Sequence, residues 1–173
     1  MKDNIIGRKE EIIKLEKYLA SGKSEFVAIY GRRRVGKTFL VKELFEGKFA
    51  FRMTGKENAN TKEQLENFHY ALSNYTENTD LPKTWTQAFH QLEKYIEHEA
   101  EEGSKILFFD ELTLFDTRGS KFVSALEHFW NDWAAYRNDI KLIVCGSATT
   151  WMLNKVVNSK GGLHNRDTHT MLL

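Results

Sequence analysis

The sequence contains a single cysteine, Cys145, and a single proline, Pro82, among its 173 residues. One cysteine excludes an internal disulfide, so the fold has to depend on an apolar core. No apolar run approaches the ~20 residues that a membrane-spanning helix requires. The 25 lysines and arginines nearly balance the 24 acidic residues, which excludes the broad basic field typical of generic nucleic-acid or membrane attraction. We therefore expect a soluble, cytoplasmic protein that does not contact membranes.

The length is enough for one well-packed domain and too short for two ordinary ones. Hydrophobic residues make up 41% of the chain and charged residues 28%, as in globular proteins. Apolar strand-like runs cover 26–30, 49–53, 105–109, 140–145 and 168–173, and helical patterns cover 8–20, 38–45, 61–73, 84–100 and 120–136, with one more helix beginning near 151. Asn60 and Thr84 are expected N-caps, and Cys145 is expected in the core. This alternation predicts an α/β fold with a parallel sheet covered by helices on both faces.

A phosphate-binding loop is predicted directly after the first strand-like run, where the spacing is G-x-x-x-x-G-K-T. Glycines at both ends allow a tight turn in which backbone N–H groups point at phosphate oxygens. Lys37 supplies positive charge for the β- and γ-phosphates, and the hydroxyl of Thr38 is a ligand for Mg²⁺. The following helix adds its positive N-terminal end. The expected nucleotide-binding residues are Gly31, Arg32, Arg33, Arg34, Val35, Gly36, Lys37, Thr38 and Phe39.

A second part of the site is predicted at Asp110 and Glu111, which follow the apolar run 106–109. In α/β sheets ligands bind outside the carboxyl ends of the strands, so both carboxylates are expected to face the phosphate loop. Asp110 is the expected Mg²⁺ ligand. Glu111 is placed to orient and polarise the attacking water. Taken alone, the same two residues would fit a strand that ends in a solvated acidic pair.

Polar residues also follow the strand-like run 140–145. Ser147 is the candidate for a side chain that contacts the γ-phosphate or the attacking water, with Thr149 as the second choice. An alternative of equal weight is that Ser147, Thr149 or Thr150 caps the next helix, and one residue could serve both roles.

Taken together, the motifs resemble those of AAA-type ATPases of the archaeal-ATPase lineage, a branch of the P-loop enzymes near the signal-transducing STAND group. The matching stretches are 6–12, 30–38, 54–57, 108–111, 145–148 and 161–166. The resemblance implies a three-layer P-loop fold whose five-stranded parallel sheet has the order 5-1-4-3-2. It also implies that Ile5, Ile6 and Arg8 cover the adenine. Where such proteins continue an acidic pair with Leu-Pro-Trp, this chain has Leu112-Thr113-Leu114.

Arg166 lies where related ATPases carry an arginine that reaches a γ-phosphate, sometimes on a neighbouring subunit, which would imply a homo-oligomer. The alternative is a solvated loop arginine. Larger members of the family continue into a helical lid, a winged-helix segment and often a nuclease-like domain. We expect residues 1–173 to be the ATPase core of a longer protein, in which DNA contacts would come only from such additional domains.

The leading functional hypothesis is Mg²⁺-dependent binding and hydrolysis of ATP by this core, coupled to a conformational switch. The catalytic candidates are Glu111, Lys37, Ser147 and Arg166, and the metal ligands are Thr38 and Asp110. One alternative is a nucleotide-binding regulatory module with little hydrolysis of its own. Others are the ATPase component of a DNA-processing protein and, less favoured, a small-molecule kinase.

Overall fold

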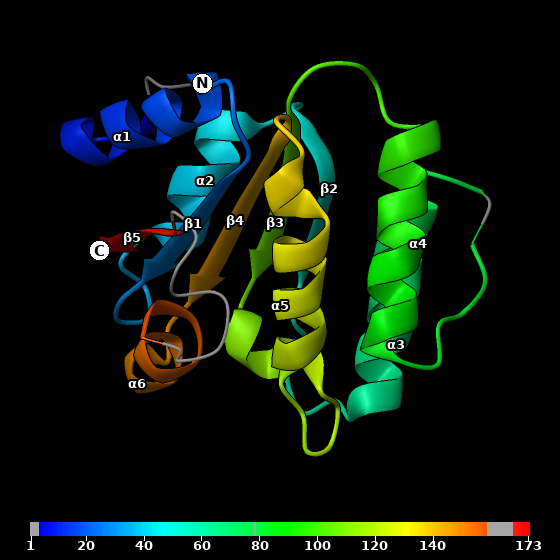
Figure 1. Cartoon of the computed structure of the whole chain (residues 1–173). Coiled ribbons are helices and arrows are strands. Elements are labelled where there is room, and N and C mark those ends of the chain that lie inside the picture. The colour runs from blue at the N-terminus through cyan, green and yellow to red at the C-terminus, as the bar shows by residue number, and fades with distance from the viewer. Residues whose placement is uncertain (1–3, 78, 159–167) are drawn as a thin grey trace.

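The computed structural model describes residues 4–77, 79–158 and 168–173. Its centre is one sheet of five parallel strands, with the spatial order β2-β3-β4-β1-β5. Read from the other edge, this is the predicted order 5-1-4-3-2, so the predicted P-loop fold class is confirmed (Figure 1). The strands are β1 (Glu25–Tyr30), β2 (Phe49–Thr54), β3 (Lys105–Asp110), β4 (Ile140–Gly146) and β5 (Thr168–Leu172).

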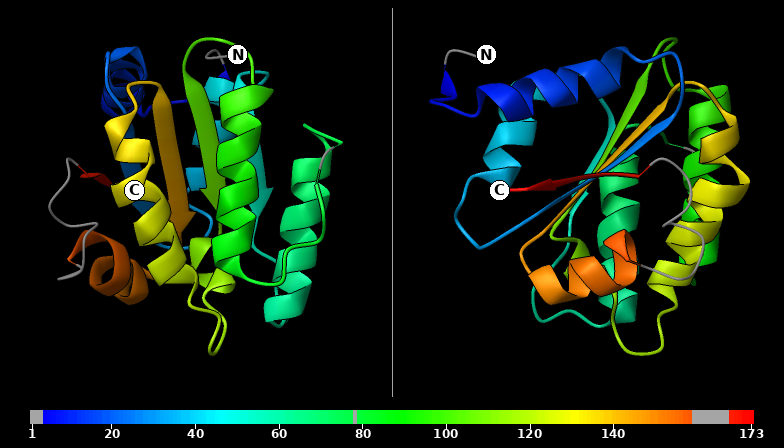
Figure 2. Two further views of the ribbon diagram at one scale, coloured as in Figure 1. Left: turned by 45° about the vertical axis from the view of Figure 1, so that its right-hand side comes forward. Right: turned by 60° about the vertical axis from the view of Figure 1, so that its left-hand side comes forward.

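Helices cover both faces of the sheet (Figure 2). One face packs against α1 (Lys9–Ala20) and α2 (Lys37–Phe45). The other packs against α3 (Thr61–Ser73), α4 (Trp85–His98) and α5 (Phe122–Asp132). Every residue of β3 and β4 is therefore buried, which is why their central segments, 106–109 and 142–145, are continuously apolar rather than alternating.

Aromatic rings fill much of the core between the sheet and α3–α5. Trp85, at the start of α4, is fully buried. Its ring lies edge-on to Phe122 at a centroid distance of 4.9 Å and to Phe115 at 5.6 Å. Phe89 stands beside Phe129 at 5.0 Å. Offset and edge-to-face pairs of this kind add to the stabilisation from apolar burial.

Both predicted N-caps are confirmed. The Asn60 side chain accepts the backbone N–H of Glu63 in a capping box, and the Thr84 side chain accepts the N–H of Gln87. Each cap satisfies a donor that the first helical turn leaves open.

The predicted single helix over 120–136 is wrong at its ends. Helix α5 stops at Asp132, and a separate 3₁₀ turn covers Ala134–Tyr136. Between them Trp133 leaves the helical conformation, with φ −132° and ψ −64°. From there its indole N–H donates to Glu97 of α4. The helix therefore ends where Trp133 contacts α4, whereas the helical pattern of the sequence predicts that it continues.

Strand β4 leads into the short helix α6 (Thr149–Met152), which continues as a wider π-type turn, Leu153–Val157. Its N-cap position is Ala148 and no side chain caps it, so the capping alternative for Ser147, Thr149 and Thr150 is wrong. Cys145 lies in β4, and its burial raises the pKa of the thiol well above the usual range. The expectation of a core cysteine is confirmed.

Within the described part of the chain, no helix combines the length and apolar character needed to cross a bilayer.

Replacing Trp85 tests the aromatic core. Trp85→Ala removes a fully buried ring and should lower the free energy of unfolding by about 3–5 kcal/mol. Trp85→Phe should cost less, because the buried indole N–H has no hydrogen-bond partner among the described residues. Tyr70→Ala, at a side chain that is 73% exposed, is the control and should change the value by less than about 0.5 kcal/mol. Denaturant unfolding measures all three, and equal losses for Trp85→Ala and the control would contradict the prediction.

Candidate phosphate and metal site

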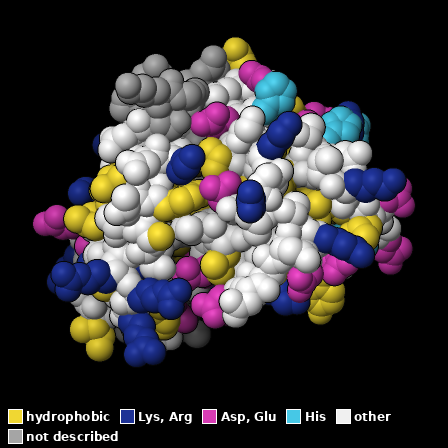
Figure 3. Space-filling view, turned by 90° about the horizontal axis from the view of Figure 1, so that it is seen from below, with side chains coloured by type: hydrophobic (Ala, Val, Ile, Leu, Met, Phe, Trp, Pro, Cys, Tyr) yellow, Lys and Arg dark blue, Asp and Glu magenta, His cyan; other side chains and the backbone are white. Residues whose placement is uncertain are grey.

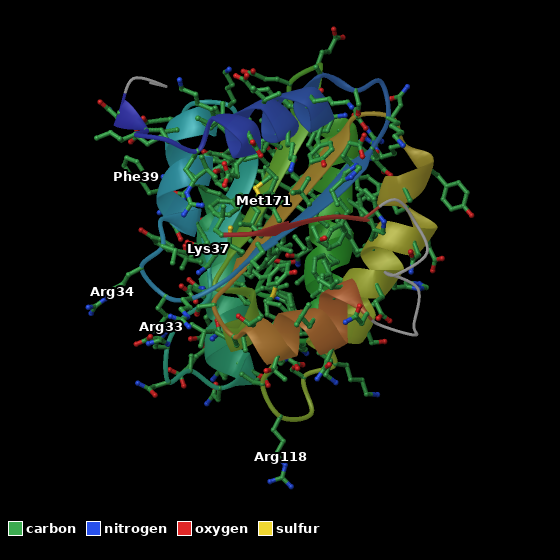
Figure 4. All side chains as sticks on the ribbon, turned by 90° about the vertical axis from the view of Figure 1, so that its left-hand side faces the viewer. Arg33, Arg34, Lys37, Phe39, Arg118 and Met171 are labelled. Atoms are coloured by element: carbon green, nitrogen blue, oxygen red, sulfur yellow. The ribbon has the colours of Figure 1, made fainter. Side chains whose placement is uncertain are left out.

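The predicted phosphate loop spans the gap between the end of β1 and the start of α2. Lys37, the first residue of α2, is only 6% exposed. Its ammonium group folds back over the loop and donates to the carbonyl oxygens of Gly31 at 3.0 Å and Arg32 at 2.7 Å. Figure 4 shows Lys37 inside the loop, whereas Arg33 and Arg34 extend outward from it. A positive charge is therefore held at the centre of the loop.

The two motif glycines are needed for different reasons. Gly36 has φ +88° with open space around it, so only its backbone conformation disfavours a side chain. Gly31 has φ +141°, and a Cβ built there would lie 2.1 Å from the carbonyl oxygen of Leu173. The chain leaving β5 thus passes directly over the first residue of the loop, and the N–H of Leu173 donates to the carbonyl of Tyr30.

The predicted metal ligands lie side by side. The hydroxyl of Thr38 donates to the Asp110 carboxylate, with distances of 3.0 Å to Oδ1 and 2.8 Å to Oδ2. Asp110 ends β3 and is 3% exposed, and Thr38 is in the first turn of α2. Residues 72 positions apart in sequence thus form an oxygen pair at the carboxyl ends of two strands, as the sequence predicts.

Glu111 turns the chain sharply after β3. Its backbone is left-handed, with φ +51° and ψ +51°, a conformation that non-glycine residues rarely adopt and that concentrates at functional sites. Its N–H donates to Oδ1 of Asp110. The hydroxyl of Ser147 lies 3.5 Å from Oε2 of Glu111. The structure therefore brings together Ser147, Glu111 and Asp110 from the ends of β3 and β4.

A pocket of about 570 Å³ opens beside the loop. Its lining residues are Arg33, Arg34, Gly36, Lys37, Thr38, Phe39, Thr54, Gly55, Glu57, Glu111 and Leu114. Seen from below, the surface at the carboxyl ends of the strands carries basic side chains gathered at one corner with acidic ones beside them (Figure 3). Of the predicted nucleotide-binding residues of the loop, Gly31, Arg32 and Val35 are not part of this lining.

The predicted adenine-covering residues differ in position. The Arg8 guanidinium donates to the carbonyl of Val35 at 3.3 Å and pairs with Glu11 at 3.1 Å, so it is attached to the phosphate loop. The Ile6 side chain is 97% exposed. Neither lines the pocket. The predicted catalytic residue Arg166 lies outside the described residues.

Comparisons with known proteins show the family and the fold of this chain. A family described as the ATPase domain predominantly from Archaea matches residues 5–173. The chain belongs to this family. An uncharacterized protein of Methanocaldococcus jannaschii is 28% identical over 94% of this ATPase domain and 34% of its own length. An uncharacterized ATP-binding protein of the same organism is 46% identical over 25% of this domain and 73% of its own length.

Solved structures show the same fold. The Walker-type ATPase of Pyrococcus abyssi superposes with a TM-score of 0.65 at 20% identity, over 99% of the ATPase domain and 54% of that chain. The ORC2 protein of Aeropyrum pernix, in ADPNP–ADP complexes, gives 0.62 at 15% identity, over 98% of this domain and 48% of that chain. The domain thus spans between a third and about half of the length of these longer relatives.

The sequence does not predict Thr54 and Leu114, which line the pocket, nor three further residues of this ATPase domain's site. Gly55 allows close approach, because a Cβ there would lie 2.7 Å from the Glu111 carbonyl oxygen. Gln64 of α3 is fully buried. Its side-chain amide accepts the backbone N–H of Lys56 and donates to the carbonyl oxygens of Lys56 and Leu114. Glu57 lines the pocket. For Gly55 and Glu57 the only sequence signal is that the segment 54–57 belongs to the family resemblance.

Alanine at each motif glycine should separate conformational strain from steric overlap. Gly36→Ala should cost about 1–2 kcal/mol of unfolding free energy, from the left-handed backbone alone. Gly31→Ala should cost more, because the new methyl group also overlaps the Leu173 carbonyl. Gly22→Ala, in open space without a positive φ, is the control and should have little effect. Denaturant unfolding without nucleotide measures the series, and a Gly31→Ala loss no larger than that of Gly36→Ala would contradict the prediction.

Proposed function

We propose that this ATPase domain binds ATP with Mg²⁺ and hydrolyses it. The observation that carries the proposal is the contact between the Thr38 hydroxyl and the Asp110 carboxylate beside the buried ammonium group of Lys37. A hydroxyl and a carboxylate are the oxygen ligands that Mg²⁺ takes next to substrate phosphates. A site for Mg²⁺ and a site for the phosphates of ATP would thus lie next to each other at the carboxyl ends of the strands.

The residues present fit both groups. The pocket of about 570 Å³ is within the usual range of small-molecule sites, roughly 300–1,000 Å³. Its loop is built on left-handed residues and on the N-terminus of α2, a combination that directs N–H groups at an anion. Phe39, 48% exposed at the pocket wall, offers an apolar surface for the adenine ring, next to the loop to which Arg8 is attached. Ile6 would have to fold onto the base from its exposed position.

Each proposed role follows from the position of a side chain. Lys37 exchanges its two carbonyl partners for phosphate oxygens. Thr38 and Asp110 hold Mg²⁺, which supplies charge neutralisation at the phosphates. Glu111 orients water at the terminal phosphate and accepts its proton. Ser147 keeps the Glu111 carboxylate in place through their 3.5 Å contact.

A second candidate is a nucleotide-dependent module that hydrolyses little by itself. The exposure of Phe39 and Ile6 favours it, because an open base site excludes water poorly. The length of the relatives also supports a core that acts within a larger protein, as a switch for further domains. Assembly into a homo-oligomer, with Arg166 reaching a neighbour's nucleotide, and DNA contacts through additional domains belong to that proposal.

Glu111→Gln tests the proposed role of Glu111, and the unaltered chain measured beside it separates the two candidates. Removing the base should leave ATP binding intact while lowering turnover by about 10²–10⁴-fold. Phosphate release measures turnover, and the shift in melting temperature with ADP, ATP and a non-hydrolysable analogue measures binding. Glu102→Gln, at an exposed carboxylate, is the control. Unchanged turnover in Glu111→Gln would remove this residue from the mechanism, and binding without phosphate release in the unaltered chain would favour the second candidate.

A further inference from the structure

An ion pair crosses the mouth of the pocket. Arg33, from the loop after β1, lies 3.7 Å from a carboxylate oxygen of Glu57, from the loop after β2. Both side chains line the pocket and both are largely exposed, at 74% and 70%. An anion that enters the pocket is therefore attracted by Arg33, which is already paired, and repelled by the carboxylate of Glu57.

The backbone that leads into Glu57 is held by hydrogen bonds at the two preceding residues. The backbone of Lys56 is bonded at both its N–H and its carbonyl to the buried amide of Gln64. One residue earlier, the N–H of Gly55 donates to the Asp110 carbonyl at 2.9 Å. The loop that carries Glu57 is thus attached to the same turn that presents Glu111. The ion pair lines the same pocket as Glu111, beside which the terminal phosphate has to lie for water to attack it.

The energetics favour an exchange of partners. An ion pair between two exposed side chains contributes little, because water screens it and two long side chains must be ordered. A guanidinium binds phosphate through two parallel, charge-assisted hydrogen bonds, which are stronger. Glu57 itself can only repel the phosphates. Arg33 therefore gains by leaving Glu57 once a terminal phosphate is within reach.

We propose that Arg33 exchanges Glu57 for the terminal phosphate of the nucleotide and makes the site prefer a triphosphate over a diphosphate. Glu57 acts as the competing anion that lowers affinity until a third phosphate displaces it. This inference rests on the proposed nucleotide binding and adds a residue that distinguishes ATP from ADP. Among the three loop arginines it selects Arg33.

Binding of ADP and of a non-hydrolysable ATP analogue, titrated with Mg²⁺ by calorimetry, tests the exchange. Arg33→Ala should weaken the analogue by about tenfold or more, as expected for loss of a charged hydrogen bond, and ADP by less than about threefold. Glu57→Gln should strengthen the analogue by about threefold, since an exposed ion pair and its repulsion are removed. In the Arg33→Ala background the gain from Glu57→Gln should shrink, because no cation remains to be released.

Arg118→Ala is the matched control. Arg118 is exposed in a different loop and points away from the body of the molecule (Figure 4), so its removal changes net charge equally and should leave both affinities unchanged. Melting without nucleotide shows that each variant is folded. Weaker analogue binding in Glu57→Gln, or equal losses for both nucleotides in Arg33→Ala, would overturn the exchange while leaving nucleotide binding intact. An unaltered chain that binds neither nucleotide would overturn both proposals.

Discussion

The parallel pairing of β1, β4 and β3 is the constraint on which the site depends. Parallel strands end at the same edge of a sheet, so the residues that follow each of them meet there. In this chain those residues are the phosphate loop after β1, Asp110 and Glu111 after β3, and Ser147 after β4. Helices on both faces bury the apolar segments 106–109 and 142–145 of β3 and β4, and the polar residues of the site lie at or beyond the ends of these strands. The apolar packing of the strands therefore brings the polar and charged groups of the site to the same end of the sheet.

Much of this could be predicted from the sequence, because the relevant signals are local. A glycine-rich turn between an apolar run and a helix identifies the loop, and a buried run ending in two carboxylates identifies its partner. The meeting of Thr38 with Asp110 follows once both segments are assigned to parallel strands. The full strand order was predicted only through the resemblance to AAA-type ATPases, since spacing does not specify which strands are neighbours.

The remaining features depend on contacts between distant segments, and no local pattern encodes them. Gln64 looks like an ordinary polar position in a helix, yet it is buried because two loops place their backbone groups around it. Trp133 continues a helical pattern, yet it leaves the helix where its indole reaches α4. The sequence explains the glycine at position 31 by the turn alone, whereas the structure shows that the Leu173 backbone also passes close to it. In each of these three cases, a residue that is distant in the sequence but close in space determines the local structure.

The two hydrogen bonds from Lys37 to carbonyl oxygens determine how the phosphate loop is held when no ligand is bound. A buried ammonium group without partners would tend to open the loop or draw in water. Here the loop supplies two carbonyl acceptors for the Lys37 ammonium group, so the phosphate loop keeps its shape without a ligand. Under the proposed function, release of product would then require no local refolding, and the next nucleotide would meet a loop that is already organised to receive it.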